Sequence, residues 1–154
     1  MNAARSVVSA LIGRKFSEID FDKTGMITSL KLQRALSNGT LRPFNIDACR
    51  LIIFQFDPMR HGFVGIERFE SLWNYINDWK FEFVELSENM GFLTMRQLQS
   101  ALTKYGCLYF DDFIYLCIML QRITPPFRYL DRNANGRINI HFEEFVIMIL
   151  SAQI

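Results

Sequence analysis

The sequence lacks both an excess of one charge and the cysteine and histidine patterns that hold metals. Its 17 Lys and Arg residues and 16 Asp and Glu residues give a net charge of +1, and no basic stripe predicts nucleic-acid binding. Cys49, Cys107 and Cys117 have neither CxxC spacing nor a neighbouring histidine, so we expect reduced, mostly buried thiols. His61 and His141 lie far apart, outside any zinc or catalytic-triad spacing, and no phosphate-cradling glycine motif is present. We therefore expect no enzyme activity.

Long hydrophobic runs are also missing, although half of the 154 residues are hydrophobic and 15 are Phe. The longest runs, at 113–120 and 145–150, are far short of the roughly 20 residues that span a bilayer. The apolar patch near the N-terminus has helical spacing and no cleavage-like end, which argues against a signal peptide. We expect a soluble cytoplasmic protein, with nuclear or peripheral endomembrane locations as alternatives.

Four loops of one pattern are present instead. Each has glycine at its sixth position, an aliphatic residue two places later, and amphipathic helical stretches on both sides. The loops are "DFDKTGMITSLK" (20–31), "DPMRHGFVGIER" (57–68), the weaker "LSENMGFLTMRQ" (86–97) and "DRNANGRINIHF" (131–142). A helix–loop–helix repeat of about 30 to 40 residues therefore organises the chain.

Apolar spacing of three or four residues predicts one long helix from Phe69 to about Leu86. A second long helix is predicted over 110–123, followed by a short helix that Thr124 caps, with Pro125 and Pro126 in its first turn. Strands are expected only as short pieces at loop positions seven to nine. The predicted fold class is all-α, with tandem helix–loop–helix EF-hand repeats and very short β-pairing between loops.

The loop spacing is that of calcium-binding EF-hands, which supply oxygens from positions one, three, five, seven, nine and twelve, the last normally a bidentate glutamate. In the first loop the weak candidate ligands are Asp20, Asp22, Thr24 and the Met26 carbonyl. Position twelve is Lys31, whose ammonium repels the ion. The second loop keeps only Asp57, and the third begins with Leu86 and ends with Gln97.

The last loop offers Asp131, Asn133, Asn135 and the Arg137 carbonyl as weak candidate ligands. Its twelfth position is Phe142, and Glu143 is turned about 100° away on a helix. With so few charged ligands, calcium affinity is expected at ~10⁻⁴ M or weaker. Two interpretations stay open: Asp, Asn and Gly fold these loops without a metal, or calcium fills the first or last loop.

Several segments resemble the penta-EF-hand family, in particular its programmed-cell-death-linked adaptor type. They are "ALSNGTLRPFN" (35–45), "LWNYINDW" (72–79), "FDDFIYLCIMLQRIT" (110–124) and "FRYLDRNANGRI" with "FEEF" (127–145). The resemblance implies a single EF-hand domain over 1–154. Its hands would lie at about 8–38, 46–78, 74–105 and 124–150, with 107–123 as the remnant of a deleted fourth hand.

The resemblance implies a protein-interaction adaptor that binds Pro-rich segments in a hydrophobic pocket. The matching pocket positions are Ile76, Trp79, Tyr105 and Phe142, although apolar residues at helical spacing are also typical of a core. The alternatives are a regulatory subunit of a larger enzyme and a working calcium sensor. Membrane contact is expected to be peripheral at most.

The family's odd last hand pairs with its copy in another subunit, which implies a homo- or heterodimer. Loss of the fourth hand leaves two arrangements open. Either the third loop pairs with the last loop inside one chain and favours a monomer, or the dimer persists and leaves the third hand exposed.

Overall fold

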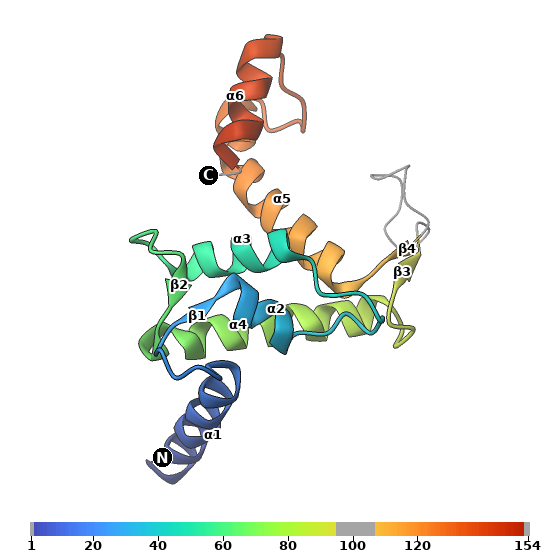
Figure 1. Cartoon of the computed structure of the whole chain (residues 1–154). Coiled ribbons are helices and arrows are strands. Elements are labelled where there is room, and N and C mark those ends of the chain that lie inside the picture. Colours follow the sequence, from blue (N-terminus) through green and yellow to red (C-terminus); the bar gives the residue numbers. More distant parts are fainter. Residues whose placement is uncertain (1, 95–106, 153–154) are drawn as a thin grey trace. The chain divides into compact units, whose positions relative to one another are not determined.

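A computed structural model describes residues 2–94 and 107–152, and these residues confirm the predicted all-α class with very short β-pairing between loops. The chain divides into two compact units, residues 1–114 and 115–154. The elements in chain order are α1 (Asn2–Ile19), β1 (Ile27–Thr28), α2 (Ser29–Ala35), α3 (Ile46–Phe56), β2 (Phe63–Val64), α4 (Ile66–Leu86), β3 (Leu93–Thr94), β4 (Cys107–Leu108), α5 (Phe110–Leu130) and α6 (Phe142–Ala152). Figure 1 shows this order along the chain. The single-domain arrangement and the hand boundaries stay predictions.

All four loops have left-handed backbone at the same two positions. The residues at their fourth and sixth positions have left-handed φ angles, which glycine adopts without strain at the sixth. The residues are Lys23 and Gly25, Arg60 and Gly62, Asn89 and Gly91, and Ala134 and Gly136. The third loop shares these two positions although it begins with Leu86 in place of an aspartate, but it differs at its third position, where Glu88 is also left-handed.

Aromatic side chains join the helices of the first unit. α1 contacts α4, and α2 contacts α3. The Phe16 and Phe69 rings meet edge to face with centroids 5.2 Å apart. Phe83 on α4 lies between Phe110 and Phe113 of α5, with ring centroids 5.5 and 5.4 Å away. These contacts bury large apolar areas and fix α4 as the central helix of the unit.

The loops pair through two separate two-stranded ladders (Figure 1). Ile27 faces Val64 in the first ladder, which joins the first and second loops. Leu93 faces Leu108 in the second. The third loop therefore neither pairs with the last loop nor stays exposed, so both predictions for its strand are wrong, while the choice between monomer and dimer stays a prediction. β4 directly precedes α5, so residues 107–123 contain a strand followed by a helix, and their origin as the remnant of a fourth hand stays a prediction.

The long helix α4 confirms the predicted helix that leaves the second loop and enters the third. The predicted break at Thr124 is wrong, because α5 runs through Pro125 and Pro126 to Leu130. The Thr124 hydroxyl donates to the Leu120 carbonyl at 2.6 Å, so it bonds the preceding turn and does not cap a new helix. Proline's fixed φ is itself compatible with a helix.

A buried carboxylate at the start of α5 binds residues 36–45, the segment that connects the first two hands. Asp111 Oδ2 accepts hydrogen bonds from Asn38 Nδ2 at 3.0 Å and from the Asn45 amide at 2.9 Å. The Asn45 side chain in turn caps α3 by accepting from the Asp47 and Ala48 amides. The connection therefore packs against α5 through polar bonds as well as through Phe44, whose ring centroid lies 5.8 Å from that of Phe110.

Among the helices that the structure describes, none combines the length and hydropathy needed to cross a membrane.

Candidate functional site

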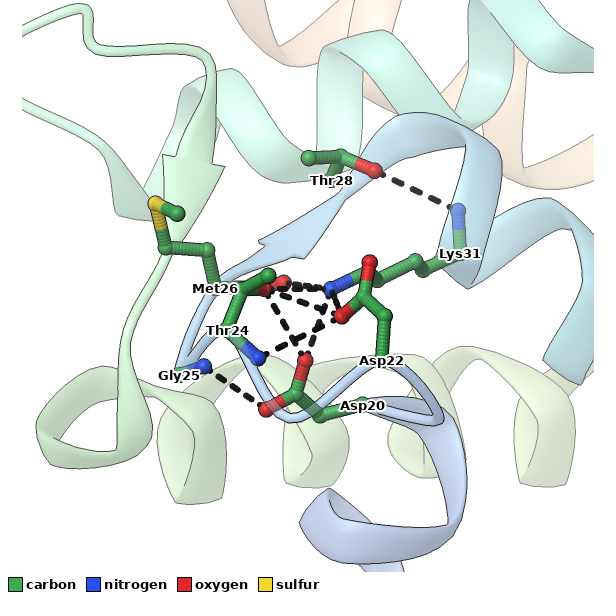
Figure 2. Close-up of polar contacts among 7 residues, drawn as sticks. All are labelled: Asp20, Asp22, Thr24, Gly25, Met26, Thr28 and Lys31. Carbon is green, nitrogen blue, oxygen red and sulfur yellow. Dashed lines mark hydrogen bonds and ion pairs between the residues drawn. The ribbon is translucent and has the colours of Figure 1, made fainter.

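The first loop places a lysine where a calcium-binding hand has its last ligand. Thr28 caps α2, and its Oγ1 accepts from the Lys31 amide at 3.4 Å. Lys31 therefore lies in the first turn of α2, at loop position twelve. Its side chain points back into the loop and is only 7% exposed (Figure 2).

The Lys31 ammonium lies among the four groups that the sequence predicts as calcium ligands. Nζ is 2.7 Å from Asp20 Oδ1, 2.7 Å from Thr24 Oγ1 and 2.8 Å from the Met26 carbonyl oxygen. Nζ also donates to Asp22 Oδ1 (Figure 2). The predicted ligands of the first loop are therefore brought together, and the cation at their centre is part of the chain.

The rest of the loop supports this arrangement. The Gly25 amide donates to Asp20 Oδ2 at 2.7 Å, which leaves Oδ1 for the ammonium. The Thr24 hydroxyl lies 3.0 Å from Asp22 Oδ1, to which it donates. Calcium needs six to eight oxygens at 2.3–2.6 Å. Lys31 supplies no oxygen at position twelve, because an ammonium has three donors and no acceptor. With Lys31 in this position the residues of the loop do not fit a calcium ion.

The charges in the cluster shift one another's pKa values. The hydrogen bond from Lys31 lowers the pKa of Asp20 from 3.8 to about 2, although burial acts in the opposite direction. Burial alone would lower the pKa of Lys31, but the hydrogen bonds to Asp20 and Asp22 outweigh it and raise that pKa above 10.5. Both groups are therefore charged at neutral pH, because each stabilises the charged form of the other.

The second loop has no comparable cluster. Asp57 is buried and accepts from the Gly62 amide at 2.6 Å, while His61 Nδ1 lies 3.6 Å from the other oxygen of Asp57. The basic residue at position twelve, Arg68, is exposed, unlike Lys31. In the third loop, Gln97 lies outside the described residues. A positive charge at position twelve is therefore not sufficient for the arrangement seen at Lys31.

The last loop folds around hydrogen bonds to its own backbone. Asp131 accepts the Asn135 amide at 3.1 Å and the Gly136 amide at 2.8 Å, and Asn135 Oδ1 accepts the Arg137 amide at 3.0 Å. Asn133 and Arg137 are exposed. Asp131, the Asn133 and Asn135 amides and the Arg137 carbonyl stay predicted ligands, but a carboxylate at position twelve is missing.

The exit helix of the last hand begins later than that of the first. α6 begins at Phe142, loop position twelve, whereas α2 begins at loop position ten. Glu144 Oε2 accepts the His141 amide at 2.8 Å, so this glutamate caps the helix. Residues 137–140 form no strand. Across residues 2–94 and 107–152, no three His, Cys, Asp or Glu side chains converge to hold a metal ion.

The predicted partner-binding residues lie in different environments. Ile76 is buried in the core of the first unit. Trp79 is half-buried and packs edge to face on Phe113, with centroids 5.9 Å apart. Phe142 belongs to the second unit and is 75% exposed, and Tyr105 lies outside the described residues. The structure therefore leaves Trp79 and Phe142 available to partners, and the pocket as a whole stays a prediction.

The chain is similar to several known proteins. It is 30% identical over 159 residues to human peflin, covering 88% of this chain and 56% of peflin. Sorcin from Schistosoma japonicum is 31% identical over 155 residues, covering 85% and 89% of the two chains. Human grancalcin is 30% identical over 146 residues, covering 79% and 67%. The chain thus spans little more than half the length of human peflin.

A solved structure shares the fold. It is described as a homolog of programmed cell death 6 protein from Leishmania major Friedlin. It matches with a TM-score of 0.72 and 22% identity, covering 92% of this chain and 89% of the other. The sequence matches no protein-family model.

The cluster around Lys31 predicts a stability that falls at both ends of the pH range. Asp20 stabilises the fold above pH 3.8, and this contribution is lost as the pH falls towards 2. Lys31 stabilises the fold below pH 10.5, and this contribution is lost as the pH rises through its raised pKa. At neutral pH, Lys31→Met should lower the thermal midpoint by about 5 °C.

The measurement is the difference between the thermal midpoints of the wild type and Lys31→Met, taken from pH 3 to pH 11. Groups outside the cluster contribute equally to both proteins and cancel in the difference. The difference should be largest between about pH 5 and pH 10 and should narrow outside that window. A difference that is constant with pH would contradict the prediction.

Proposed function

Because the chain belongs to the penta-EF-hand family, we propose that this EF-hand protein of the calcium-binding type acts as a protein-interaction adaptor whose calcium response is weak or lost. The observation that carries the proposal is the Lys31 ammonium among the oxygens of the first loop. An ion with two positive charges has to displace this ammonium before it can reach the same oxygens. Calcium binding by the first hand therefore carries a cost that is missing from a hand with glutamate at position twelve.

The remaining loops add little capacity for calcium. None of the four has glutamate at position twelve, which holds Lys31, Arg68, Gln97 and Phe142. That glutamate supplies two of the calcium oxygens, so each loop lacks its strongest ligand. Asp57 and Asp131 are the single carboxylates at the starts of the second and last loops, and both accept backbone amides. These bonds support loops that fold without a metal.

For partner binding, the first unit offers a shallow aromatic surface around Trp79. A pocket of about 250 Å³ is lined by Tyr75, Asp78, Trp79 and Glu82, all on α4. Aromatic grooves bind Pro-rich segments because such segments are already extended and lose little entropy on binding. Trp79 supplies a large apolar area at little entropic cost. These features support the Pro-rich partners that the family resemblance implies.

For assembly, the last hand has no pairing strand within the part of the chain that the structure describes. Within the described residues, β1 pairs with β2 and β3 with β4, while residues 137–140 form no strand. α6 also exposes the large apolar side chains of Phe142, Phe145, Ile147 and Leu150. An unpaired loop edge beside exposed apolar groups favours a partner chain. We therefore propose a homo- or heterodimer through this hand.

A calcium titration tests the weak calcium response. The two tryptophans, Trp73 and Trp79, both lie on α4 and report changes through their fluorescence. With magnesium held at millimolar concentration, no saturating change is expected below ~10⁻⁴ M calcium. A saturating change at micromolar calcium would instead identify a working sensor and overturn the proposal.

Substitutions on α4 test the aromatic surface. Trp79→Ala should reduce capture of the chain by an immobilised Pro-rich peptide at least about tenfold, because an aromatic anchor is lost. Trp73→Ala is the matched control, since Trp73 is also half-buried on α4 but stacks on Phe69. Equal capture losses in the two variants would show a general packing effect and count against the site. Thermal midpoints measured in parallel identify any loss of fold.

Sedimentation velocity tests the dimer. At micromolar concentration the wild type should sediment at twice the 18.1 kDa mass of the chain. Ile147→Asp should shift it to a monomer by placing a charge on the exposed apolar face of α6. Leu41→Asp introduces the same charge at a fully exposed site in the first unit and should leave the mass unchanged. A wild-type monomer would contradict the homodimer and leave only a heterodimer with another chain.

A further inference from the structure

The first loop combines a site for a cation with a cation from the chain itself. Oxygens from positions one, three, five and seven converge on Lys31 Nζ. Asp20 is buried, and without a cation between them the carboxylates of Asp20 and Asp22 would repel each other. The ammonium offsets this repulsion. It lies at the centre of these oxygens, where a metal ion would otherwise lie.

The position of Lys31 links the loop to the exit helix. In EF-hand sensors, the ligand at position twelve lies on the exit helix, so ion binding draws that helix towards the loop and changes the angle between helices. Lys31 lies in the first turn of α2, and its bonds to the loop join the same two parts. α2 then contacts α3 of the second hand. The mechanical connection that calcium normally makes is therefore already present.

The bonds between Lys31 and the loop form despite an unfavourable electrostatic field at the start of α2. The N-terminus of a helix carries a partial positive charge, which disfavours a cation in its first turn. The carboxylates of Asp20 and Asp22 compensate at Lys31, which is 7% exposed. Arg68 occupies the equivalent position in the second loop, where Met59 replaces the second carboxylate, and it is exposed. The inward lysine thus depends on two carboxylates, which the first loop alone provides at positions one and three.

We propose that Lys31 is a tethered replacement for calcium that keeps the first hand permanently in its ion-loaded conformation, so that the pair formed by the first and second hands engages partners without a calcium signal. A cation on the same chain is present at a high effective concentration whatever the ion content of the solution. The inference deepens the proposed function and rests on its weak calcium response.

The same geometry makes position 31 a switch between two cations. Exchange of the ammonium for a carboxylate would remove the internal cation and supply the missing bidentate ligand. The oxygens of Asp20, Asp22, Thr24 and Met26 already converge, so the substituted loop would have the ligand pattern of a calcium-binding hand. The first hand should then require calcium for the conformation that Lys31 now gives it.

The experiment compares the wild type with Lys31→Glu in calcium and in chelator. Calorimetry should show one more bound calcium per chain in Lys31→Glu than in the wild type. The dissociation constant of this additional site should be at least about tenfold lower than ~10⁻⁴ M. In chelator the variant should melt at a lower temperature than the wild type, and millimolar calcium should restore the midpoint. Amide exchange over residues 20–35 should be slow in the wild type in both media, but slow in Lys31→Glu only with calcium.

Two controls separate a switch from a general effect of charge. Arg68→Glu makes the same charge change at the same loop position but on an exposed side chain, and it should add no calcium site. Lys31→Met removes the cation without adding a ligand. It should lower the thermal midpoint and speed amide exchange over residues 20–35, and calcium should restore neither, because position twelve still lacks a carboxylate.

The outcomes distinguish this inference from the proposed function. If the wild type binds calcium in its last loop, the weak calcium response fails, yet Lys31→Glu should still bind one equivalent more. If Lys31→Glu binds no additional calcium, or folds in neither medium, the replacement of calcium by Lys31 is wrong. Wild-type stability and exchange in Lys31→Met would also overturn it, because the ammonium would then hold nothing in place.

Discussion

The first hand depends on an ion pair in which neither partner could be buried alone. Asp20 is 5% exposed and Lys31 is 7% exposed, and a buried charge without a counter-charge is strongly unfavourable. Each group therefore specifies the position of the other. Since Asp20 directly follows α1 and Lys31 lies in α2, their contact fixes both ends of the loop. β1 lies between these ends and pairs with β2, so the contact also positions the ladder to the second hand.

Much of the fold could be predicted from local chemistry. Glycine at position six and the flanking apolar periodicity located the loops and helices, and the Asn45 side chain caps α3 as its residue type indicates. Thr124 was misleading, because a hydroxyl next to two prolines is typical of a helix start. It can equally bond the carbonyl one turn earlier, and this choice depends on packing that the sequence does not contain.

The site was predicted only in part for a related reason. Aspartates at positions one and three with lysine at position twelve predict that the lysine repels calcium, and this stays a prediction. They do not by themselves indicate where the lysine side chain goes. The signal that could have identified an inward lysine is the pair of carboxylates together with Thr28, which places Lys31 in the first turn of the exit helix. Arg68 has no second carboxylate to attract it and stays exposed.

The strand pairing of the third loop shows how little partner structure is needed to pair the strand of an EF-hand loop. β3 pairs with the two residues of β4, and α5 then packs its aromatic side chains on α4. A strand followed by an exit helix therefore satisfies the edge of the third loop. One short strand and the helix after it are enough for this purpose, so the third loop does not need the last loop as its partner.

The buried lysine has a genetic consequence. Lysine and glutamate codons differ only in their first base, so a single point mutation at position 31 exchanges a cation for a carboxylate within an otherwise unchanged set of oxygens. If Lys31 replaces calcium as we propose, a requirement for calcium in this hand would be gained or lost in one mutational step.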